Sequence, residues 1–593
     1  MSRNRFKRSA RSILAGLLVL CLSLSGLLSC GTPGSGEPAR ESGTAETSVD
    51  PVVSSVDPES EEAPVLRTLA QNGELLFRIF YPRQGSDFEQ SAAEELGEVL
   101  GDLAGGSIEV LSDVALYEEE RLDIYVGNTR YPESAEVLSE IGYGDYALRT
   151  VGNKIVVAAT QSSALKAAIR VLLAAIRGVS ADGVVSYPEN AGTTVTLIPL
   201  LSAIPKIGTS SLKSWTIAEN SSYTMASSGV GEEQYTAYLD KLQAAGFICH
   251  AEKTVSDNLF ATYGNGQAAV NVSYYPLKRT FHVTVDSLEY TALPEKAVGT
   301  FTRLCTTQLS MLGCSANAKN DNGLSLFFRL PDGRFLIWDG GGNEPVSDAA
   351  NLYEKLCASA GEAGVEKIVV AGWFLTHCHG DHAYVYQQFC RAYTDRVTVE
   401  QLIFCPNARD YGPAVSDGIA IETNTMTLTR TKYPQAKIVI ARAGQTFLFP
   451  DVRVDVLFTL DAMMPYAFND YNASSVVCMV TVGDKKILIT GDSQTDSINF
   501  LTDVYGDELH CDYLQVPHHG AIPGGTVKAY RTIQPGWLLW PAGPLTFESV
   551  LSDSYDGSSI NHYLLEDMGM AEKMTLAGSL GDIFTVTFAE TEE

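Results

Sequence analysis

The segment 376–382 concentrates residue types that bind divalent metal ions. It reads Thr-His-Cys-His-Gly-Asp-His and holds three of the nine histidines in the chain. His377 and His379 are two residues apart, so on an extended backbone their rings point the same way and can hold one ion. The glycine that follows lets the chain turn sharply, which would bring Asp381 and His382 to face a second ion. Imidazole and carboxylate groups suit zinc and similar ions, so the spacing predicts a metal site.

The elements before this segment place it at the end of a buried strand. Lys367–Leu375 is a continuous apolar run, which is typical of a strand buried on both faces. Ser325–Leu330 and Phe335–Trp338 are predicted strands on either side of a Pro-Asp-Gly turn, and Ala349–Ala360 is a predicted helix. The region 301–593 is therefore expected to be an α/β domain that carries the chemistry.

The first motif resembles the His-x-His-x-Asp-His signature of the metallo-β-lactamase fold. Three later features agree with this resemblance. A strand that ends at Asp339 matches the family's strand whose Asp steadies the metal loop. An apolar strand ends in Gly-Asp at Asp492, the family's position for a carboxylate shared by two metals, and another ends in His518-His519-Gly. The resemblance covers nearly all of 301–593 and implies an αββα sandwich.

One departure from the family pattern narrows the resemblance. Many members carry a further histidine between the first motif and the shared Asp, but this chain has none between His382 and His510. In lacking this histidine, the chain resembles the branch that contains the metallo-β-lactamase domain of DNA-uptake competence proteins and the choline-phosphate esterase of cell-wall teichoic acid. The segments 469–477 and 561–583 also resemble that branch.

The resemblance implies two divalent metal ions, with zinc expected first and manganese or iron as alternatives. The first ion would be short of one protein ligand, a gap that water would fill. We favour His519 as a ligand and His518 as the group that faces the substrate, and we expect His562 to be either an outer contact or a structural histidine. The implied ligands of the first ion are His377, His379 and Asp492, and those of the second are Asp381, His382, Asp492 and His519.

Two neighbouring divalent ions imply hydrolysis by an activated hydroxide. Asp381 and Asp492 would orient that hydroxide, and His518 would donate a hydrogen bond or proton to the leaving oxygen. Because the resembling branch acts on phosphodiesters, the expected enzyme is a phosphodiesterase-like metallohydrolase whose substrate is a small molecule or a cell-envelope glycopolymer. The alternatives are a hydrolase of another ester or lactam bond, and a non-catalytic glycan-binding lipoprotein with a degenerate metal domain.

The N-terminus predicts export and lipid attachment. Residues 1–12 carry five basic side chains and no acid, and an apolar run from Ile13 to Leu28 follows, which together indicate a signal peptide over residues 1–29. The run ends in Leu-Leu-Ser-Cys, which resembles the bacterial lipobox, so Cys30 is the expected lipidated residue. Residues 30–66 are predicted to be a disordered tether. This combination predicts a protein anchored to the outer face of the bacterial cytoplasmic membrane, whereas an ordinary secretory signal is the alternative.

Two smaller units are predicted between the tether and the metal domain. Residues 67–200 alternate strand and helix patterns, and the motifs at 123–129, 144–146 and 152–153 resemble the small support domain of family-20 hexosaminidases, which carries no chemistry. Residues 201–300 predict a small α+β unit in which Tyr263, Tyr274 and Tyr275 either form a binding face or pack in the sheet.

The length, composition and net charge of the chain exclude some classes of protein. The chain has 593 residues, of which 45% are hydrophobic, enough for several separate cores. Its net charge of −29 repels phosphate backbones, so no stable nucleic-acid partner is expected. Only the N-terminal run is apolar enough to enter a bilayer, which excludes a polytopic membrane protein.

Overall fold

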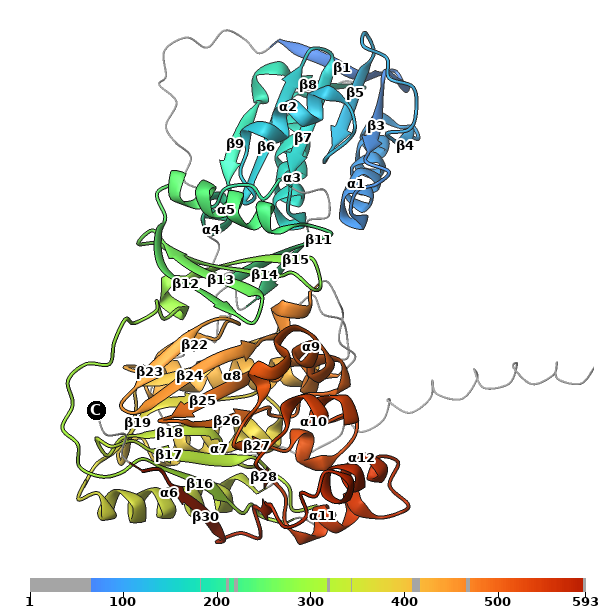
Figure 1. Ribbon diagram of the computed structural model, residues 1–593. Helices are drawn as coiled ribbons and strands as arrows, with labels where there is room; N and C mark the ends of the chain where they lie inside the picture. Colours follow the sequence, from blue (N-terminus) through green and yellow to red (C-terminus); the bar gives the residue numbers. More distant parts are fainter. Residues whose placement is uncertain are drawn as a thin grey trace, which may run out of the picture. The chain divides into compact units, whose positions relative to one another are not determined.

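The computed structural model describes residues 65–181, 183–208, 213–217, 222–316, 320–342, 344–407, 416–464 and 470–589 (Figure 1). The predicted signal peptide, Cys30 and nearly all of the predicted tether lie outside the described residues. Within the described part of the chain, no helix is long and apolar enough to cross a membrane.

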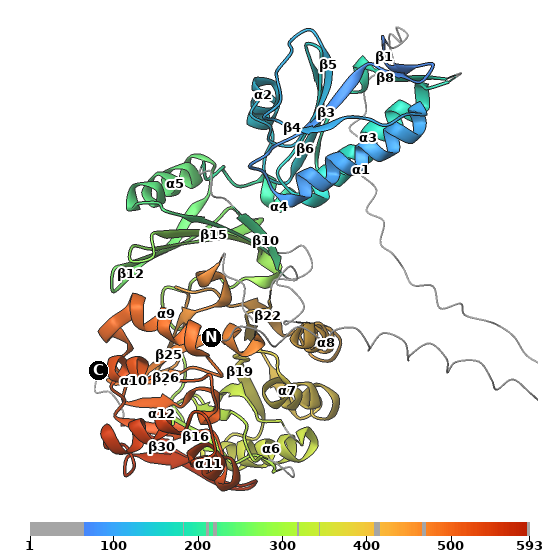
Figure 2. The same cartoon turned by 90° about the vertical axis from the view of Figure 1, so that its right-hand side faces the viewer.

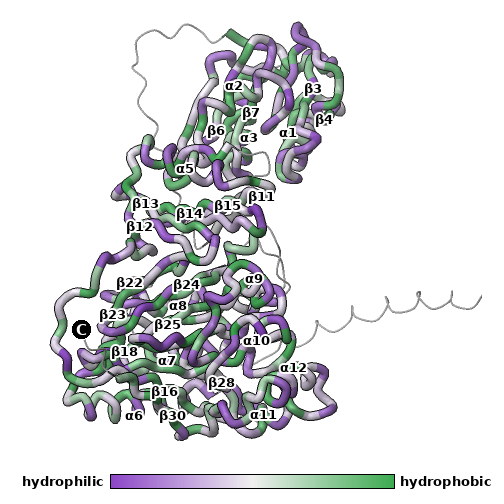
Figure 3. The backbone as a smooth tube through the Cα atoms, viewed as in Figure 1, coloured by the Kyte–Doolittle hydropathy of each residue, from purple (hydrophilic) through white to green (hydrophobic). Residues whose placement is uncertain are grey.

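The region that begins at Leu66 is built on a mixed sheet with the strand order β4-β3-β5-β7-β6-β9 and a small sheet with the order β2-β1-β8. Its helix α3 has an apolar face that packs in the core. Figure 3 shows hydrophobic and hydrophilic residues interspersed over the elements of this region. The elements are β1 (Leu66–Gln71), β2 (Glu74–Leu75), β3 (Phe77–Tyr81), α1 (Asp87–Ala104), β4 (Val110–Ser112), β5 (Leu122–Val126), α2 (Pro132–Glu140), β6 (Asp145–Val151), β7 (Lys154–Ala159), α3 (Ser162–Val179), β8 (Val184–Pro188), β9 (Thr193–Thr196) and α4 (Pro199–Ser202).

The next region is an antiparallel sheet with the order β10-β11-β15-β14-β13-β12 and one long helix, α5. Tyr263, Tyr274 and Tyr275 are buried in it, so the packing interpretation of these rings is confirmed. The elements are β10 (Lys213–Ile217), β11 (Ser222–Ser228), α5 (Glu232–Ala244), β12 (Ile248–Val255), β13 (Asn258–Gly264), β14 (Ala268–Tyr275) and β15 (Thr280–Ser287).

The C-terminal region contains two large sheets. The first has the order β22-β21-β19-β18-β17-β16-β30, with β20 paired to β19, and the second has the order β23-β24-β25-β26-β27-β28-β29. The strands of the first are β16 (Gln308–Leu312), β17 (Ser325–Arg329), β18 (Phe335–Asp339), β19 (Ile368–Phe374), β20 (Val397–Val399), β21 (Gln401–Phe404), β22 (Lys437–Ile440) and β30 (Ile583–Thr587). Those of the second are β23 (Thr446–Phe449), β24 (Val452–Phe458), β25 (Val477–Val482), β26 (Lys485–Ile489), β27 (Tyr513–Gln515), β28 (Trp537–Trp540) and β29 (Met574–Leu576).

The two sheets pack face to face, and helices cover both outer faces (Figure 2). Because successive side chains of a strand point to opposite faces, an apolar strand needs a core on each face. In β18, Leu336 and Trp338 point into the core between the sheets, whereas Phe335 and Ile337 point to the helix-covered side. The predicted αββα sandwich is thus confirmed. Its helices are α6 (Pro345–Glu362), α7 (Gly380–Ala392) and α8 (Ser416–Lys432) on one side and α9 (Thr495–Tyr505) and α10 (Val527–Ile533) on the other, followed by α11 (Pro544–Leu551) and α12 (Ser558–His562).

A buried ion pair joins the α5-containing region to the sandwich. Arg442 donates to both carboxylate oxygens of Asp286, at 2.6 and 3.0 Å, and also to Ser222. All three side chains are buried. A buried charge pair of this kind is stable only while both partners are present, so the two regions depend on each other at this point.

Candidate metal centre

The first motif lies where β19 ends and α7 begins. His377 follows the strand, and His379 is the N-cap of α7, so Asp381 and His382 lie in the first turn of the helix. The sequence argument expected a glycine-induced loop turn at this point. The turn is instead the start of a helix, whose N-terminal end favours a negative group such as the Asp381 carboxylate.

Asp339, at the end of β18, holds this motif in place. One of its carboxylate oxygens accepts from the Thr376 backbone N–H at 2.7 Å, and the other accepts from the Thr376 hydroxyl at 2.7 Å and from His382 Nδ1 at 2.8 Å. Because His382 uses Nδ1 as the donor to Asp339, Nε2 is the ring nitrogen that faces Asp492 and that would bind a metal ion. The structure therefore places Asp339 where a residue that steadies the metal loop must lie.

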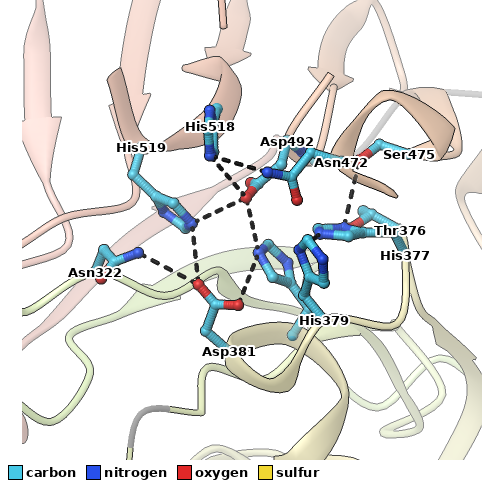
Figure 4. A network of polar contacts seen from close by, with 12 residues as sticks. Asn322, Thr376, His377, His379, Asp381, Asn472, Ser475, Asp492, His518 and His519 are labelled. Atoms are coloured by element: carbon cyan, nitrogen blue, oxygen red, sulfur yellow. Dashed lines mark hydrogen bonds and ion pairs between the residues drawn. The ribbon is translucent and has the colours of Figure 1, made fainter. Parts of the chain in front are cut away.

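Four predicted ligands converge from three segments of the chain. Asp381, His382, Asp492 and His519 each offer one possible ligand atom, and these atoms lie within 4.8 Å of one another. Figure 4 shows Asp381, Asp492 and His519 turned toward one another. Asp492 Oδ2 lies 3.2 Å from His382 Nε2 and 3.4 Å from His519 Nε2. Within the described residues, both of these buried nitrogens lack a hydrogen-bond partner. Buried polar atoms without partners are costly, and a divalent cation fits this donor set.

The charges around this group favour a cation. Burial alone would lower the pKa of His382, but the carboxylates of Asp492, Asp339 and Asp381 raise it well above its usual value. The pKa of Asp492 is in turn held well below its usual range, since His382 and His519 outweigh the effect of burial. The same negative field that holds a proton on His382 would stabilise a bound metal ion.

The remaining two histidines of the motif form a second pair beside this group. His377 Nε2 lies 3.2 Å from His379 Nδ1. His377 Nδ1 contacts the Thr376 hydroxyl at 3.2 Å, and because that hydroxyl donates to Asp339, it accepts from Nδ1–H. Burial lowers the pKa of His377 well below its usual value. A neutral ring with its proton on Nδ1 would turn the lone pair of Nε2, which faces His379, to a metal ion.

His518 and His519 differ in surroundings, although neither has the extended backbone that would send neighbouring side chains to opposite sides. The strand ends at Gln515, and both histidines have left-handed backbone conformations, with φ of 50° and 56°, instead of an extended one. His519 is 2% exposed, and its Nδ1 donates to the Pro541 carbonyl at 2.8 Å. His518 is 18% exposed, and its Nε2 lies 3.1 Å from Asn472 Nδ2.

His562 is not part of this group. Its Nε2 contacts the Leu551 carbonyl at 3.1 Å, and its Nδ1 lies 3.3 Å from Glu566 on the same helical segment. These contacts match the structural alternative for this residue.

The family comparison agrees with the geometry. A model of the metallo-β-lactamase superfamily matches residues 319–522. The C-terminal region contains a metallo-β-lactamase superfamily domain. A search of curated proteins finds no significant match.

Solved structures with this fold are also similar to the chain. The metallo-β-lactamase fold protein YhfI from Bacillus subtilis is 14% identical with a TM-score of 0.30, and the match covers 48% of this chain and all (100%) of YhfI. CmlA, a diiron β-hydroxylase from Streptomyces venezuelae, is 14% identical with a TM-score of 0.29, over 48% of this chain and 54% of CmlA. A diphosphatase of the PhnP family is 12% identical with a TM-score of 0.27, over 48% of this chain and 100% of that chain.

Several residues around the centre of the metallo-β-lactamase domain had no assigned role in the sequence argument. Asn322 donates to Asp381 Oδ2 at 3.3 Å, and the Ser475 hydroxyl accepts from the Asp492 backbone N–H at 3.0 Å. Ser475 lies in the segment 469–477, and the resemblance of this segment to the competence-protein branch could have pointed to Ser475. Asn322 had no signal, because it is far from the motif in sequence.

Proposed function

We propose that the chain is a metal-dependent hydrolase with a centre of two divalent ions. The observation that carries this proposal is the convergence of Asp381, His382, Asp492 and His519 on one point, with the pair His377 and His379 beside it. The proposed ligands of the two ions are those the sequence predicted. Zinc is the proposed metal, and the donor set also suits manganese and iron.

The bound ions would supply Lewis acidity and a hydroxide nucleophile at neutral pH. Asp492 would be shared by both ions and Asp381 would orient the nucleophile. His518, which is more exposed than its neighbour, would donate a hydrogen bond or a proton to the leaving oxygen. Asp339 would act only through His382 and Thr376, by keeping the motif in its binding geometry.

We propose a phosphodiester as the substrate class, and a cell-envelope glycopolymer as its source. The support is the resemblance of the motifs to the competence-protein and teichoic-acid-esterase branch, including the absence of a middle histidine. Export would bring the enzyme to such polymers.

A substrate panel tests this function. The soluble form without residues 1–30 would be assayed on chromogenic phosphodiesters, phosphomonoesters, thioesters and β-lactams, with and without a chelator. The proposal expects chelator-sensitive turnover that is fastest on phosphodiesters and is lost in Asp492→Ala. If β-lactams or thioesters are turned over faster than phosphodiesters, the proposed substrate class is wrong. Turnover that survives the chelator would refute the metal-dependent mechanism.

We also propose that the protein is a lipoprotein anchored through Cys30 to the outer face of the bacterial cytoplasmic membrane. The support is the lipobox-like sequence after a basic and apolar leader. Cys30→Ala should release the protein from the membrane fraction. If the variant still fractionates with membranes as the wild type does, the lipoprotein assignment is wrong.

A further inference from the structure

The first metal position is short of a protein ligand. His377 and His379 supply two ring nitrogens, and Asp492 supplies a shared carboxylate, whereas the second position has four converging side chains. The sequence has no histidine between His382 and His510, and His510 is a half-exposed residue beside Asp507. The missing ligand therefore has to come from another residue type or from water.

Asn472 has a side-chain oxygen without a hydrogen-bond partner among the described residues, on the side of the centre where His377 and His379 lie (Figure 4). It lies on the short helix η5 (Tyr471–Ser474) and is only 7% exposed. Its amide nitrogen donates to His518 Nε2 at 3.1 Å, and its carbonyl oxygen is buried without a hydrogen-bond partner among the described residues. Figure 4 shows the amide nitrogen toward His518 and the carbonyl oxygen toward the side where His377 and His379 lie.

This orientation of the Asn472 amide is the one that a cation bound beside His377 and His379 would favour. A metal ion attracts the negative carbonyl end of an amide and repels its NH2 end. The His518 ring holds the NH2 end away from the two histidines of the motif, because Nε2 accepts its hydrogen bond. A buried carbonyl oxygen that makes no other bond gains the most from binding an ion.

The neighbours of Asn472 fix the segment that carries it. The Tyr471 ring packs on His379 with ring centres 5.1 Å apart, and its hydroxyl donates to the buried Glu422. The Ser475 hydroxyl accepts from the Asp492 backbone. The segment 471–475 is thus held against residues of both metal positions, as a ligand-bearing segment must be.

We propose that the side-chain carbonyl oxygen of Asn472 is the missing protein ligand of the first metal ion, together with His377, His379 and Asp492. This assignment rests on the two-ion centre of the proposed function. It adds a consequence for metal choice. With an amide oxygen in place of an imidazole nitrogen, each position has two nitrogen and two oxygen donors, so the two positions should differ little in their preference between zinc and manganese.

Metal binding to the full chain in detergent tests the assignment. The protein would be stripped of metal and titrated with Zn²⁺ and Mn²⁺ by calorimetry, with bound metal counted by elemental analysis. Asn472→Ala should weaken one of two binding events by at least about tenfold and leave the other unchanged. The unchanged event also shows that the variant is folded.

Asn472→Asp separates a ligand from a hydrogen-bond donor. A carboxylate keeps an oxygen for the ion but cannot donate to His518, so Asn472→Asp should retain both binding events. If it weakens the first ion as Asn472→Ala does, the NH2 contact and not the carbonyl oxygen matters, and the assignment is wrong. Unchanged binding of both ions in Asn472→Ala would also overturn it.

His518→Ala is the matched control for the other candidate ligand. It removes the imidazole near Asp492 but leaves the Asn472 oxygen, so both ions should remain. If His518→Ala removes the first ion and Asn472→Ala does not, His518 is the missing ligand. A wild-type chain that binds fewer than two ions would instead refute the two-ion centre on which the proposed function rests.

Discussion

The adjacent histidines 518 and 519 are identical side chains with different surroundings. His519 is fixed by a backbone carbonyl and turns a free nitrogen to Asp492, whereas His518 contacts an amide and is more exposed. We expect His519→Ala to lose metal from the second position and activity with it. His518→Ala should keep near-normal metal but turn over about 10²–10⁴-fold more slowly if the ring is a general acid.

The leaving group provides the check on that role. The defect of His518→Ala should shrink for substrates whose leaving groups need no proton, as measured by kcat on a series of aryl phosphodiesters. Metal lost in His518→Ala and retained in His519→Ala would exchange the two roles. Normal metal and normal activity in both variants would remove the pair from the site.

A buried histidine outside the centre predicts a pH effect on stability. His282, on β15, donates from Nε2 to the Met464 carbonyl at 3.1 Å, and its Nδ1 has no partner among the described residues. Burial lowers its pKa below the usual 6.5, so below about pH 6.5 the unfolded chain takes up a proton that the folded chain does not. The free energy of unfolding should therefore fall, by at most about 1.4 kcal/mol per pH unit, as pH drops through this window.

His282→Gln supplies the comparison, because glutamine keeps a donor without a titrating ring. The free energy of unfolding of the wild type, measured in urea, should decrease relative to that of His282→Gln between pH 7 and pH 5. A constant difference between the two proteins over this range would show that His282 is protonated equally in the folded and unfolded chains.

Sequence reasoning at the residue scale succeeded where the residues are neighbours in the chain. The motif 376–382 stood out because its candidate ligands are contiguous, and Asp492 because its strand and turn are recognisable, and the structure brings Asp381, His382 and Asp492 together. The hydrogen bonds from Asn322 to Asp381 and from Asn472 to His518 join residues 59 and 46 positions apart, so no local pattern predicts them. The left-handed backbone of His518 and His519 was missed because such conformations are rare outside glycine.

At the scale of elements, the turn after β26 carries Asp492 and depends on one glutamine. The Gln515 side chain accepts from the backbone N–H groups of Thr490 and Gly491 at 2.8 and 2.7 Å and donates to the Gly491 carbonyl at 3.0 Å. Gly491 has a φ of 56°, and a Cβ there would lie 2.6 Å from Thr376 Cβ. The turn therefore requires both a left-handed residue and the absence of a side chain.

Gly491→Ala should disturb the metal centre through this turn. We expect a loss of about 1–3 kcal/mol in the free energy of unfolding, from backbone strain and the contact with Thr376, and weaker metal binding. Gly364→Ala is the matched control, because Gly364 has a φ of 69° with nothing near its Cβ position. It should show the strain cost without the metal defect, and equal metal affinity in both variants would contradict the argument.

Strands and amphipathic helices were largely predictable because their periodicity is local. The predicted strands Ser325–Leu330, Phe335–Trp338 and Lys367–Leu375 are present as β17, β18 and β19, each with ends within one residue of the prediction. The motif at 152–153 is the turn of the hairpin formed by β6 and β7. The start of α7 was not predicted, since the glycine and the polar candidate ligands of its first turn interrupt the apolar pattern. The binding site thus obscures the local signal of the element that carries it.

At the scale of the molecule, the Arg442–Asp286 pair makes stability depend on residues 156 positions apart. Asp286→Ala leaves a buried guanidinium without its main partner, which should cost about 3–5 kcal/mol of unfolding free energy. Arg303→Ala is the control, because its bidentate pair with Asp451 is at the surface and should be worth about 1 kcal/mol at most. If the two variants lose similar amounts of unfolding free energy in urea, the buried pair contributes no more to stability than the surface pair.

The central claim is that Asp492 serves two metal ions in one chain. Elemental analysis of the metal-loaded wild type and of Asp492→Ala, at equal protein concentration, tests it most directly. We predict two divalent ions per wild-type chain and reduced occupancy of both positions in the variant, because one carboxylate is shared. Full occupancy in Asp492→Ala, or a wild-type chain that retains no metal, would contradict the account.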